Sequence, residues 1–332
     1  MGEKIGEQEI KRILSNWDIG DIHKITLIKE GEVNTNWIIK SSKGKFVLRK
    51  VKEERKPSEL EFEFLYLSYL KKDNFSYKIP LPLQTKNKKK FLEENGLFWI
   101  YNFLEGEFKE NCSKKEFIEL GKMIAEYHSI LKKLKLNNHG LILDNMAVDL
   151  VIDELEEFQK NLNDGKIKTK YDGSFMDENF KLLPLLKRLD IISYSQLKKY
   201  PIHRDMNPEN VLWDGDKIIG VIDFDNVSEL NDALIKDVAI ILQYCCINKK
   251  KLDISKAKSF LEEYQKYRPL SKKEISLIPD ILVAAFIEDF SYNFWLIINN
   301  PKKGKPQRIK SYSTIAQNIF NDKELIIKNL LN

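Results

Sequence analysis

The stretch from Pro201 to Asn226 constrains the fold of this chain more than any other part of its sequence. Residues 211–213 are apolar, residues 214–216 read Asp-Gly-Asp, and residues 217–222 are again mostly apolar and β-branched. Two such runs on either side of an Asp-Gly turn predict a β-hairpin. One polar residue, Asn210, stands directly before the first predicted strand, and another, Asp223, directly after the second. Because a hairpin brings its two ends together, we expect these two side chains to reach one point.

An amide oxygen and a carboxylate at one point suit a hard dication such as Mg²⁺ that is also bound to phosphates and water. Asp205 lies five residues before Asn210, in the loop that leads to the hairpin. There its carboxylate is placed to accept a proton from an attacking hydroxyl group while the metal holds the phosphate. A buried hairpin with ordinary turn residues is the weaker interpretation, because the spacing, the hairpin and Asp223 occur together.

Residues 203–210 read H-R-D-M-N-P-E-N, and residues 222–225 read I-D-F-D. This combination is the catalytic signature of protein-kinase-like enzymes, and it resembles the aminoglycoside phosphotransferase and choline kinase superfamily, whose members phosphorylate small molecules. The resemblance implies an α+β, protein-kinase-like two-lobed fold. It places a small antiparallel-sheet lobe over residues 1–104 and a mainly helical lobe over residues 105–332. It also implies that His203 packs under the loop and transfers no proton.

The small lobe is predicted to begin with a helix over residues 5–17 and three antiparallel strands over residues 22–27, 33–40 and 46–51. The first turn lacks the G-x-G-x-x-G loop of protein kinases. Its Gly31, followed by Asn34 and Trp37, resembles the shorter nucleotide-covering turn of the superfamily. The resemblance therefore implies that Gly31 and Asn34 contact the nucleotide.

Arg49 lies on the third predicted strand, where superfamily members usually have a lysine that pairs with the nucleotide phosphates. A guanidinium group also pairs with phosphate, as a planar fork. Pro57 opens a helix that carries the carboxylates of Glu59, Glu61 and Glu63. Glu63 best fits the E-x-x-x-L-x-x-L pattern of the superfamily, which implies that it anchors Arg49. A solvated helix charge is the open alternative for each of the three glutamates.

Residues 97–104 read L-F-W-I-Y-N-F-L and predict a buried strand that breaks at Glu105-Gly106-Glu107. The segment resembles the hinge between kinase lobes. We therefore expect the backbone N–H and C=O groups of Tyr101, Phe103 and Leu104 to meet the edge of adenine.

The chain after Lys114 is predicted to be mainly helical, including a helix over residues 182–200. The resemblance implies that His128 is a packing histidine and that Asp237 ties down the backbone of the catalytic loop. Residues 264–274 resemble the homoserine-kinase-like and spore-coat-kinase-like branches, whose last helices close the acceptor pocket. Candidate residues for that pocket are Glu288, Asp289, Tyr292 and Trp295, with helix packing as the alternative.

Composition limits the classes of partner. The chain has 332 residues with a formal net charge of +5, an excess too small to indicate a nucleic-acid partner. Three cysteines make neither a disulfide framework nor a zinc-site spacing. The N-terminus has no signal-peptide core, and Gly6 breaks the myristoylation pattern. The most apolar run, residues 238–247, is too short to span a bilayer. We therefore expect a cytoplasmic monomer or homodimer with no membrane partner.

These observations predict a phosphotransferase that uses ATP, with GTP as the alternative donor, and Mg²⁺. It would move the γ-phosphoryl group to a hydroxyl of an amino alcohol, amino acid, sugar or aminoglycoside-like compound. Asp225 and Asp289 would suit a cationic acceptor. A catalytically inactive coat or scaffold protein is the second hypothesis, supported by arginine at position 49. A protein kinase is the third, but the short span after Asp223 leaves no room for a peptide-docking loop.

Overall fold

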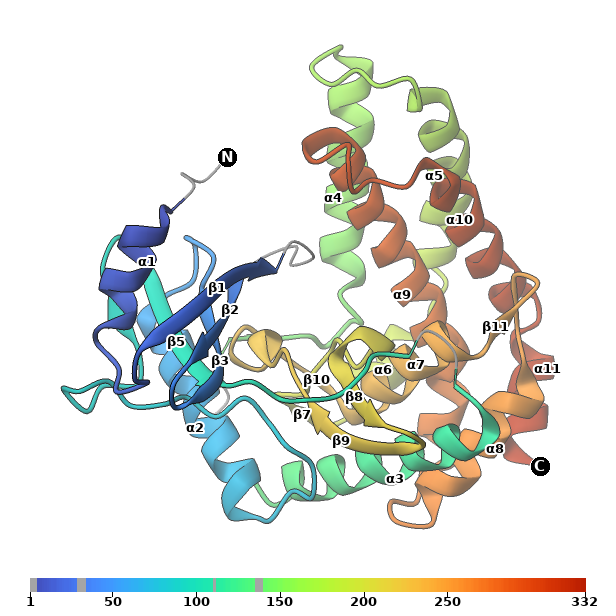
Figure 1. The fold of residues 1–332 in the computed structure, drawn as a ribbon. Helices are drawn as coiled ribbons and strands as arrows, with labels where there is room; N and C mark the ends of the chain where they lie inside the picture. Colours follow the sequence, from blue (N-terminus) through green and yellow to red (C-terminus); the bar gives the residue numbers. More distant parts are fainter. Residues whose placement is uncertain (1–4, 29–33, 110–111, 135–139) are drawn as a thin grey trace. The chain divides into compact units, whose positions relative to one another are not determined.

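The structure is a computed structural model that describes residues 5–28, 34–109, 112–134 and 140–332. The chain forms two compact units (Figure 1). The first unit contains residues 1–108 and 210–229, and the second contains residues 109–209 and 230–332. The predicted lobe ranges, 1–104 and 105–332, stay a prediction.

The first unit is built on a five-stranded sheet whose strand order is β1-β2-β3-β5-β4, with every neighbouring pair antiparallel. Its strands are β1 (Ile22–Ile28), β2 (Thr35–Ser41), β3 (Gly44–Lys50), β4 (Leu92–Glu93) and β5 (Leu97–Asn102). The first three strands form the predicted meander. The confirmed arrangement follows from short polar turns between apolar, β-branched runs.

Strand β5 is buried on both faces because α1 (Glu7–Leu14) and α2 (Pro57–Lys72) each contribute apolar side chains. Successive side chains of a strand point to opposite faces. Phe98 and Ile100 belong to the cluster that includes the buried residues of α1. On the other face, Trp99 meets Phe64 of α2 edge to face, with ring centroids 5.0 Å apart. This sandwich explains why the segment reads as a continuous apolar run.

The predicted hairpin is present as β8 (Val211–Asp214) and β9 (Lys217–Val221), flanked by the 3₁₀ turns η1 (Pro208–Asn210) and η2 (Asp225–Ser228). Its position against the segment after β5 requires a glycine. Gly106 has a φ of 153°, and a Cβ atom there would lie 2.9 Å from the Cβ of Leu212. Glu107 and Trp213 then exchange both backbone hydrogen bonds, each 2.9 Å long. The hairpin is thereby fixed to the end of the sheet within the first unit.

The second unit is mainly helical, as predicted. Its helices are α3 (Lys114–Leu131), α4 (Val148–Asn163), α5 (Asp172–Leu186), α6 (Ile191–Ser195), α7 (Leu234–Cys245), α8 (Ile254–Gln265), α9 (Lys272–Asn299), α10 (Pro306–Asn321) and α11 (Lys323–Leu331). Its short strands are β6 (Leu141–Ile142), β7 (Lys199–Tyr200), β10 (Leu230–Ala233), β11 (Ile247–Asn248) and β12 (Lys251–Leu252).

The predicted helix over residues 182–200 is wrong. Helix α5 ends at Leu186, soon after Pro184, which lacks a backbone donor. A new short helix, α6, is capped by Asp190, whose side chain accepts from the N–H of Ser193 at 3.0 Å. The segment then becomes β7, in which Tyr200 pairs with Asp232 of β10. The pairing of β7 with β10 therefore explains why residues 199–200 form a strand and not the end of a helix.

Helix α9 is the long apolar helix of the second unit and packs beside α4, α5, α7 and α10 (Figure 1). By length and composition alone it could cross a membrane, so the prediction that no run is long enough is wrong. In the structure, 72% of its most apolar window is buried inside the protein. Its Phe294 stacks on Phe175 of α5 with ring centroids 3.8 Å apart. These contacts are those of a core helix.

Candidate active site

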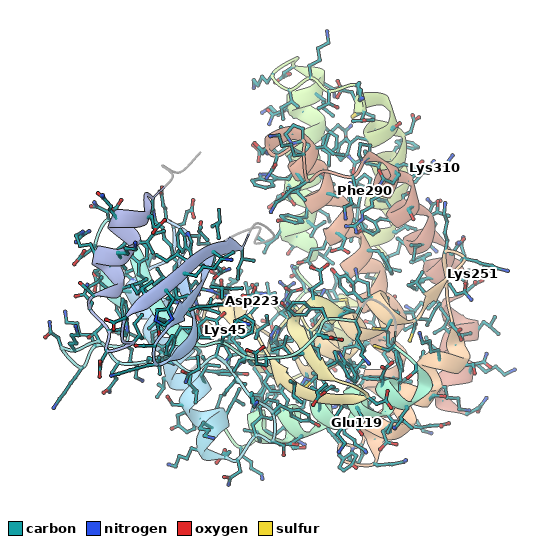
Figure 2. All side chains as sticks on the ribbon, in the orientation of Figure 1. Lys45, Glu119, Asp223, Lys251, Phe290 and Lys310 are labelled. Carbon is teal, nitrogen blue, oxygen red and sulfur yellow. The ribbon has the colours of Figure 1, made fainter. Side chains whose placement is uncertain are left out.

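The open end of the hairpin, opposite its turn, brings the backbones of Asn210 and Asp223 close together. Val211 pairs with Val221, and the N–H of Ile222 donates to the carbonyl oxygen of Asn210 at 3.0 Å. Asn210 is buried, and the side chain of Asp223, labelled in Figure 2, is 38% exposed. Asp205 belongs to the second unit, so its convergence with these two residues stays a prediction.

Two residues of the candidate site have left-handed backbone conformations. Asp223 has a φ of 66° and Arg204, directly before Asp205, has a φ of 59°. Residues other than glycine adopt this region uncommonly. Each such conformation costs about 1–3 kcal/mol and tends to persist where function requires it. The strain therefore points to the same two segments that the sequence motif selects.

The donor chemistry at the end of the hairpin fits a magnesium ion that is shared with phosphates. Asn210 supplies an amide oxygen and Asp223 a carboxylate, which are the ligand types that hard dications take. Within the described ranges, no group of three or more His, Cys, Asp or Glu side chains is suited to hold a metal. A metal held by Asn210 and Asp223 would take its remaining ligands from phosphate and water, as Mg²⁺ commonly does.

Arg49 on β3 contacts Asp223 directly. One of its terminal nitrogens, Nη1, lies 3.2 Å from Asp223 Oδ1 and 2.9 Å from Asp225 Oδ1, while Nε donates to Asn36 Oδ1 at 3.0 Å. The arginine side chain is only 5% exposed. Burial lowers the pKa of Arg49, but the two carboxylates outweigh burial and raise that pKa well above its ordinary value. A fixed positive charge therefore lies beside the candidate metal ligand.

Glu63 forms its ion pair with Arg55 and not, as predicted, with Arg49. Arg55 Nη2 lies 2.7 Å from Glu63 Oε2, and both side chains are fully buried. Burial raises the pKa of Glu63 to about 7, although Arg55 opposes this shift. The other two candidates are excluded by position: Glu59 accepts a hydrogen bond from the N–H of Lys56 at the start of α2, and Glu61 is exposed.

Asp225 is the residue of this cluster whose role the sequence interpretation missed. The sequence suggested that it faces a cationic acceptor. In the structure its carboxylate contacts both guanidinium groups, at 2.9 Å to Arg49 and 3.0 Å to Arg55, and accepts a hydrogen bond from the side-chain amide of Asn34. Its place two residues after Asp223, in I-D-F-D, was the available signal. Asp225 therefore belongs to the cluster around Arg49.

The predicted nucleotide-covering turn lies partly outside the described residues, and Gly31 is among those left out. Asn34 is buried at the start of β2. Besides its contact with Asp225, it accepts a hydrogen bond from the N–H of Lys52 at 3.1 Å. These bonds fix Asn34 beside the Arg49 cluster, and its contact with a nucleotide stays a prediction.

The predicted hinge begins in β5 and continues after it. Tyr101 is buried in the strand, and the N–H of Phe103 donates to the carbonyl oxygen of Lys45 at 2.9 Å. In the described part of the chain, the N–H of Leu104 makes no backbone hydrogen bond. That donor is of the kind that the adenine edge would require. The assignment of these three residues to adenine stays a prediction.

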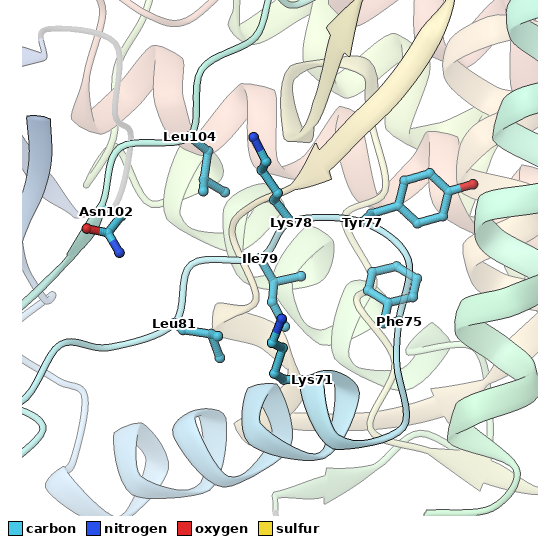
Figure 3. Close-up of a pocket in the computed structure, with 8 residues that line it drawn as sticks. All are labelled: Lys71, Phe75, Tyr77, Lys78, Ile79, Leu81, Asn102 and Leu104. Carbon is cyan, nitrogen blue, oxygen red and sulfur yellow. The ribbon is translucent and has the colours of Figure 1, made fainter.

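A cavity of about 160 Å³ lies beside this segment (Figure 3). It is lined by Lys71, Phe75, Tyr77, Lys78, Ile79, Leu81, Asn102 and Leu104. Pockets for drug-sized ligands measure roughly 300–1,000 Å³. The cavity is therefore too small for a nucleotide, and we do not assign one to it.

The catalytic loop of the second unit is held through Arg204. Its backbone N–H donates to Asp237 Oδ1 of α7 at 2.7 Å, which confirms the role predicted for Asp237. Its side chain donates from Nε to Asp232 Oδ2 at 2.9 Å and from Nη2 to Glu288 Oε1 at 3.1 Å. His203 is fully buried beside it. Three elements, β10, α7 and α9, thus fix the residue that precedes Asp205.

His128 of α3 extends this network, in keeping with its predicted packing role. Its Nε2 lies 3.3 Å from Asp237 Oδ2 and its Nδ1 lies 2.7 Å from the hydroxyl of Tyr264 in α8. Burial lowers the pKa of His128 although Asp237 opposes the shift, so the ring is neutral near pH 7. A neutral ring that donates to Asp237 must accept from Tyr264. The imidazole therefore joins α8 to the anchor of the catalytic loop.

The four candidate residues for the acceptor pocket lie on α9 and differ in their surroundings. Glu288 pairs with Arg204 and with Lys236, both at 3.1 Å. Despite burial, these two cations lower the pKa of Glu288 to about 2. Asp289 accepts a hydrogen bond from Gln243 at 2.9 Å, and burial, assisted by Glu288, raises its pKa to about 7. No ion pair to Asp289 is formed within the described ranges. A cationic ligand group would supply one.

Tyr292 and Trp295 continue the same side of α9. Their rings stack with centroids 5.9 Å apart and an interplanar angle of 8°, and each residue is 41% exposed. The helix-packing alternative is therefore incomplete for this pair, because a large part of both rings faces solvent. Their contact with an acceptor stays a prediction.

An antiparallel sheet with the hairpin, a helical unit and the arrangement of Asp223 and Arg49 together define a protein-kinase-like phosphotransferase. The chain belongs to the phosphotransferase enzyme family, whose sequence profile matches residues 24–270. It is 29% identical over 280 residues to the homoserine kinase of Rhizobium etli, covering 83% of this chain and 81% of that one. It is 26% identical over 322 residues to the homoserine kinase of Parvibaculum lavamentivorans, covering 94% and 93%.

The fold is shared with solved structures. A microcompartment-associated aminopropanol kinase superposes with a TM-score of 0.66 at 13% sequence identity, covering 98% of this chain and 99% of that one. This likeness confirms the predicted α+β, protein-kinase-like fold. The family membership confirms the predicted resemblance and the phosphotransferase class.

Proposed function

We propose that this protein transfers the γ-phosphoryl group of ATP to a hydroxyl group of a small molecule, with Mg²⁺ as the metal. The observation that carries the proposal is the contact of the Arg49 guanidinium with Asp223 at the open end of the β8–β9 hairpin, where Asn210 also lies. A cation for the phosphates and the ligands for a dication thereby lie side by side. Phosphoryl transfer depends mainly on such positioning and charge stabilisation.

The candidate site residues of the first unit would have separate roles in binding the phosphoryl donor. Arg49 would pair with the phosphates, and Asn210 and Asp223 would hold the metal, which neutralises charge on the phosphoryl oxygens when bound. The backbone of Tyr101, Phe103 and Leu104 would orient the base. Nothing in these contacts selects ATP over GTP, so GTP remains the alternative donor.

Asp205 would accept the proton of the attacking hydroxyl group. The acceptor oxygen forms a bond to the γ-phosphorus, the bond from that phosphorus to the β–γ bridging oxygen breaks, and ADP departs. The anchoring of Arg204 by Asp237, Asp232 and Glu288 supports this role, because it restrains the loop that carries the base.

We propose an acceptor that carries an amino group as well as a hydroxyl, such as an amino acid or amino alcohol. Relatives named homoserine kinases and a structural neighbour named an aminopropanol kinase agree with this class. Asp289 favours it because its half-buried carboxylate lacks an ion-pair partner within the described ranges. A neutral sugar could donate a hydrogen bond to that carboxylate but would form no ion pair with it. The cytoplasmic location, the absence of nucleic-acid or membrane partners and the monomeric or homodimeric state remain predictions.

The test is release of ADP from MgATP across a panel of hydroxy amino acids, amino alcohols, sugars and aminoglycosides. We expect turnover of at least one amine-bearing alcohol, its loss in Asp205→Ala, and normal activity in Asp214→Ala, which alters an exposed aspartate of the hairpin. No observation favours an inactive scaffold over this activity. Absence of turnover with every alcohol would refute the proposal, and labelling of peptides by radioactive ATP would indicate a protein kinase.

A further inference from the structure

One carboxylate oxygen in the first unit is shared by two arginines. Asp225 Oδ1 lies 2.9 Å from Arg49 Nη1 and 3.0 Å from Arg55 Nη1. The side-chain amide of Asn34 donates to the other oxygen, Oδ2. Both oxygens of Asp225 are therefore engaged by groups of the protein, and the residue is directed toward cations of its own unit.

Arg55 connects this carboxylate to α2. Its Nη2 lies 2.7 Å from Glu63 Oε2 and donates at 2.8 Å to Oγ of Ser228, the last residue of the turn η2 that begins at Asp225. Arg55 lies between β3 and α2, and its guanidinium group forms ion pairs with two carboxylates, those of Glu63 and Asp225. The chain of contacts runs from Glu63 through Arg55 and Asp225 to Arg49. Among the described residues, Glu63 and Arg49 form no direct ion pair.

The two carboxylates that hold Arg49 differ in exposure. The side chain of Asp223 is 38% exposed and that of Asp225 is 15% exposed. Asp223 is the proposed metal ligand, so its carboxylate oxygens are the ones that would coordinate a dication. Asp225 is then the carboxylate that keeps Arg49 in place. This charge-assisted contact from Nη1, together with the hydrogen bond from Nε to Asn36, fixes the orientation of the Arg49 guanidinium.

We infer that Asp225 and Arg55 are positioning residues for nucleotide binding. Asp225 holds the guanidinium of Arg49 in the orientation in which it would meet the phosphates. Arg55 connects Asp225 to Glu63 on α2, so Glu63 restrains Arg49 indirectly. The inference rests on the proposed function, which gives the nucleotide phosphates as the ligand of Arg49. It reverses the sequence interpretation of Asp225, which assigned that residue to the acceptor.

Direct nucleotide binding tests this inference without turnover. Calorimetric titration with MgATP would compare the wild type with Asp225→Asn, Arg55→Met and Glu63→Gln and with the double variant Arg55→Met/Glu63→Gln. We expect Asp225→Asn and Arg55→Met to raise the Kd for MgATP about tenfold. The KM for the acceptor should change less than about twofold, because none of the three residues is assigned to the acceptor.

The double variant shows the order of the contacts. If Glu63 acts on Arg49 only through Arg55, adding Glu63→Gln to Arg55→Met leaves the Kd unchanged, since coupled residues are not additive. Additive losses would mean that Glu63 acts independently and would overturn the inference. Since Arg55→Met leaves a buried carboxylate without its cation, Arg55→Lys replaces it if the protein does not fold. Lysine retains one charge but not the fork, and a Kd raised severalfold is expected.

Glu229→Gln is the matched control. The change removes the ion pair between Glu229 and Lys52, whose charged atoms lie 2.7 Å apart. Glu229 is close to Asp225 in sequence, and its ion pair does not involve Arg49. We expect this variant to bind MgATP as the wild type does. If the wild type binds MgATP and Asp225→Asn binds it equally well, the inference is overturned while the proposed function stands. A raised KM for the acceptor in Asp225→Asn would have the same meaning. A wild type that binds no nucleotide would remove the proposed function and the inference together.

Discussion

Single residues determine how this protein responds to pH. Two carboxyl groups, those of the buried Glu63 and the half-buried Asp289, have pKa values raised to about 7, in each case mainly by removal from water. They differ in their partners. Glu63 already faces Arg55, whereas Asp289 is held by the neutral amide of Gln243. A ligand cation would therefore alter the ionisation of Asp289 more than that of Glu63.

The acceptor dependence on pH follows from Asp289. Below its pKa of about 7 the carboxyl is protonated and does not attract an ammonium group. We expect the KM for an amine-bearing acceptor to fall as the pH rises from 6 to 8 and then to level off. In Asp289→Asn this dependence should vanish, with a KM about tenfold higher at pH 8. Steady-state kinetics at fixed saturating MgATP measure both effects, and an unchanged pH profile in the variant would exclude Asp289 from acceptor binding.

Whole elements determine the geometry of the catalytic loop. Helices α3, α7 and α8 meet where His128 bridges Asp237 and Tyr264, and Asp237 in turn holds the backbone of Arg204. None of these residues is adjacent to another in sequence. The packing of three helices therefore helps to fix the backbone at the start of the loop, in addition to the contacts of the Arg204 side chain.

Tyr264→Phe tests this arrangement. The change removes the hydroxyl that donates to His128 Nδ1 and leaves a buried acceptor without its partner. We expect the free energy of unfolding to fall by about 1–3 kcal/mol. The value of kcat should fall severalfold while the KM for MgATP stays the same. Denaturant unfolding and steady-state kinetics measure these effects.

Tyr267→Phe serves as the control for that variant, because Tyr267 lies just beyond the same helix and is 54% exposed. It should change the free energy of unfolding by less than about 0.5 kcal/mol. Equal losses in the two variants would contradict a specific role for the His128–Tyr264 hydrogen bond.

The contribution of Glu63 and Asp289 to the stability of the whole molecule should fall as the pH rises from about 5 to 8, while the lowered pKa of His128 acts in the opposite direction. In this window the folded state binds protons on Glu63 and Asp289 that the unfolded state has released, since unfolded carboxyl groups titrate at about 4. Stability decreases with pH wherever the folded state holds more protons. Carboxylates with lowered pKa, such as Glu288 at about 2, lose their protons in both states before this window and do not oppose the trend.

Thermal unfolding across that window checks the prediction. From pH 5 to pH 8 the wild-type Tm should fall relative to that of the double variant Glu63→Gln/Asp289→Asn, because His128 is present in both proteins. The comparison between the two profiles isolates these groups from the rest of the chain. Parallel profiles would mean that neither carboxyl titrates in this range.

Much of the fold was predictable because its signals are local. The meander of β1, β2 and β3 and the hairpin of β8 and β9 follow from alternation and turn residues within short segments. The end of the run after Leu182 was not, because β7 forms only by pairing with β10, about thirty residues later. The burial of α9 was likewise invisible to composition, which is equally compatible with a membrane helix.

The sequence by itself determined that Asn210 and Asp223 stand at the ends of a hairpin, since a turn and two apolar runs close that loop locally. It also determined the family, through the spacing of Asp205, Asn210 and Asp223. Only the tertiary structure decided which charges pair. Arg55 is eight residues from Glu63 but 170 residues from Asp225, and it contacts both. Burial forces each charge to find a partner in space, and sequence spacing does not encode which partner lies within reach.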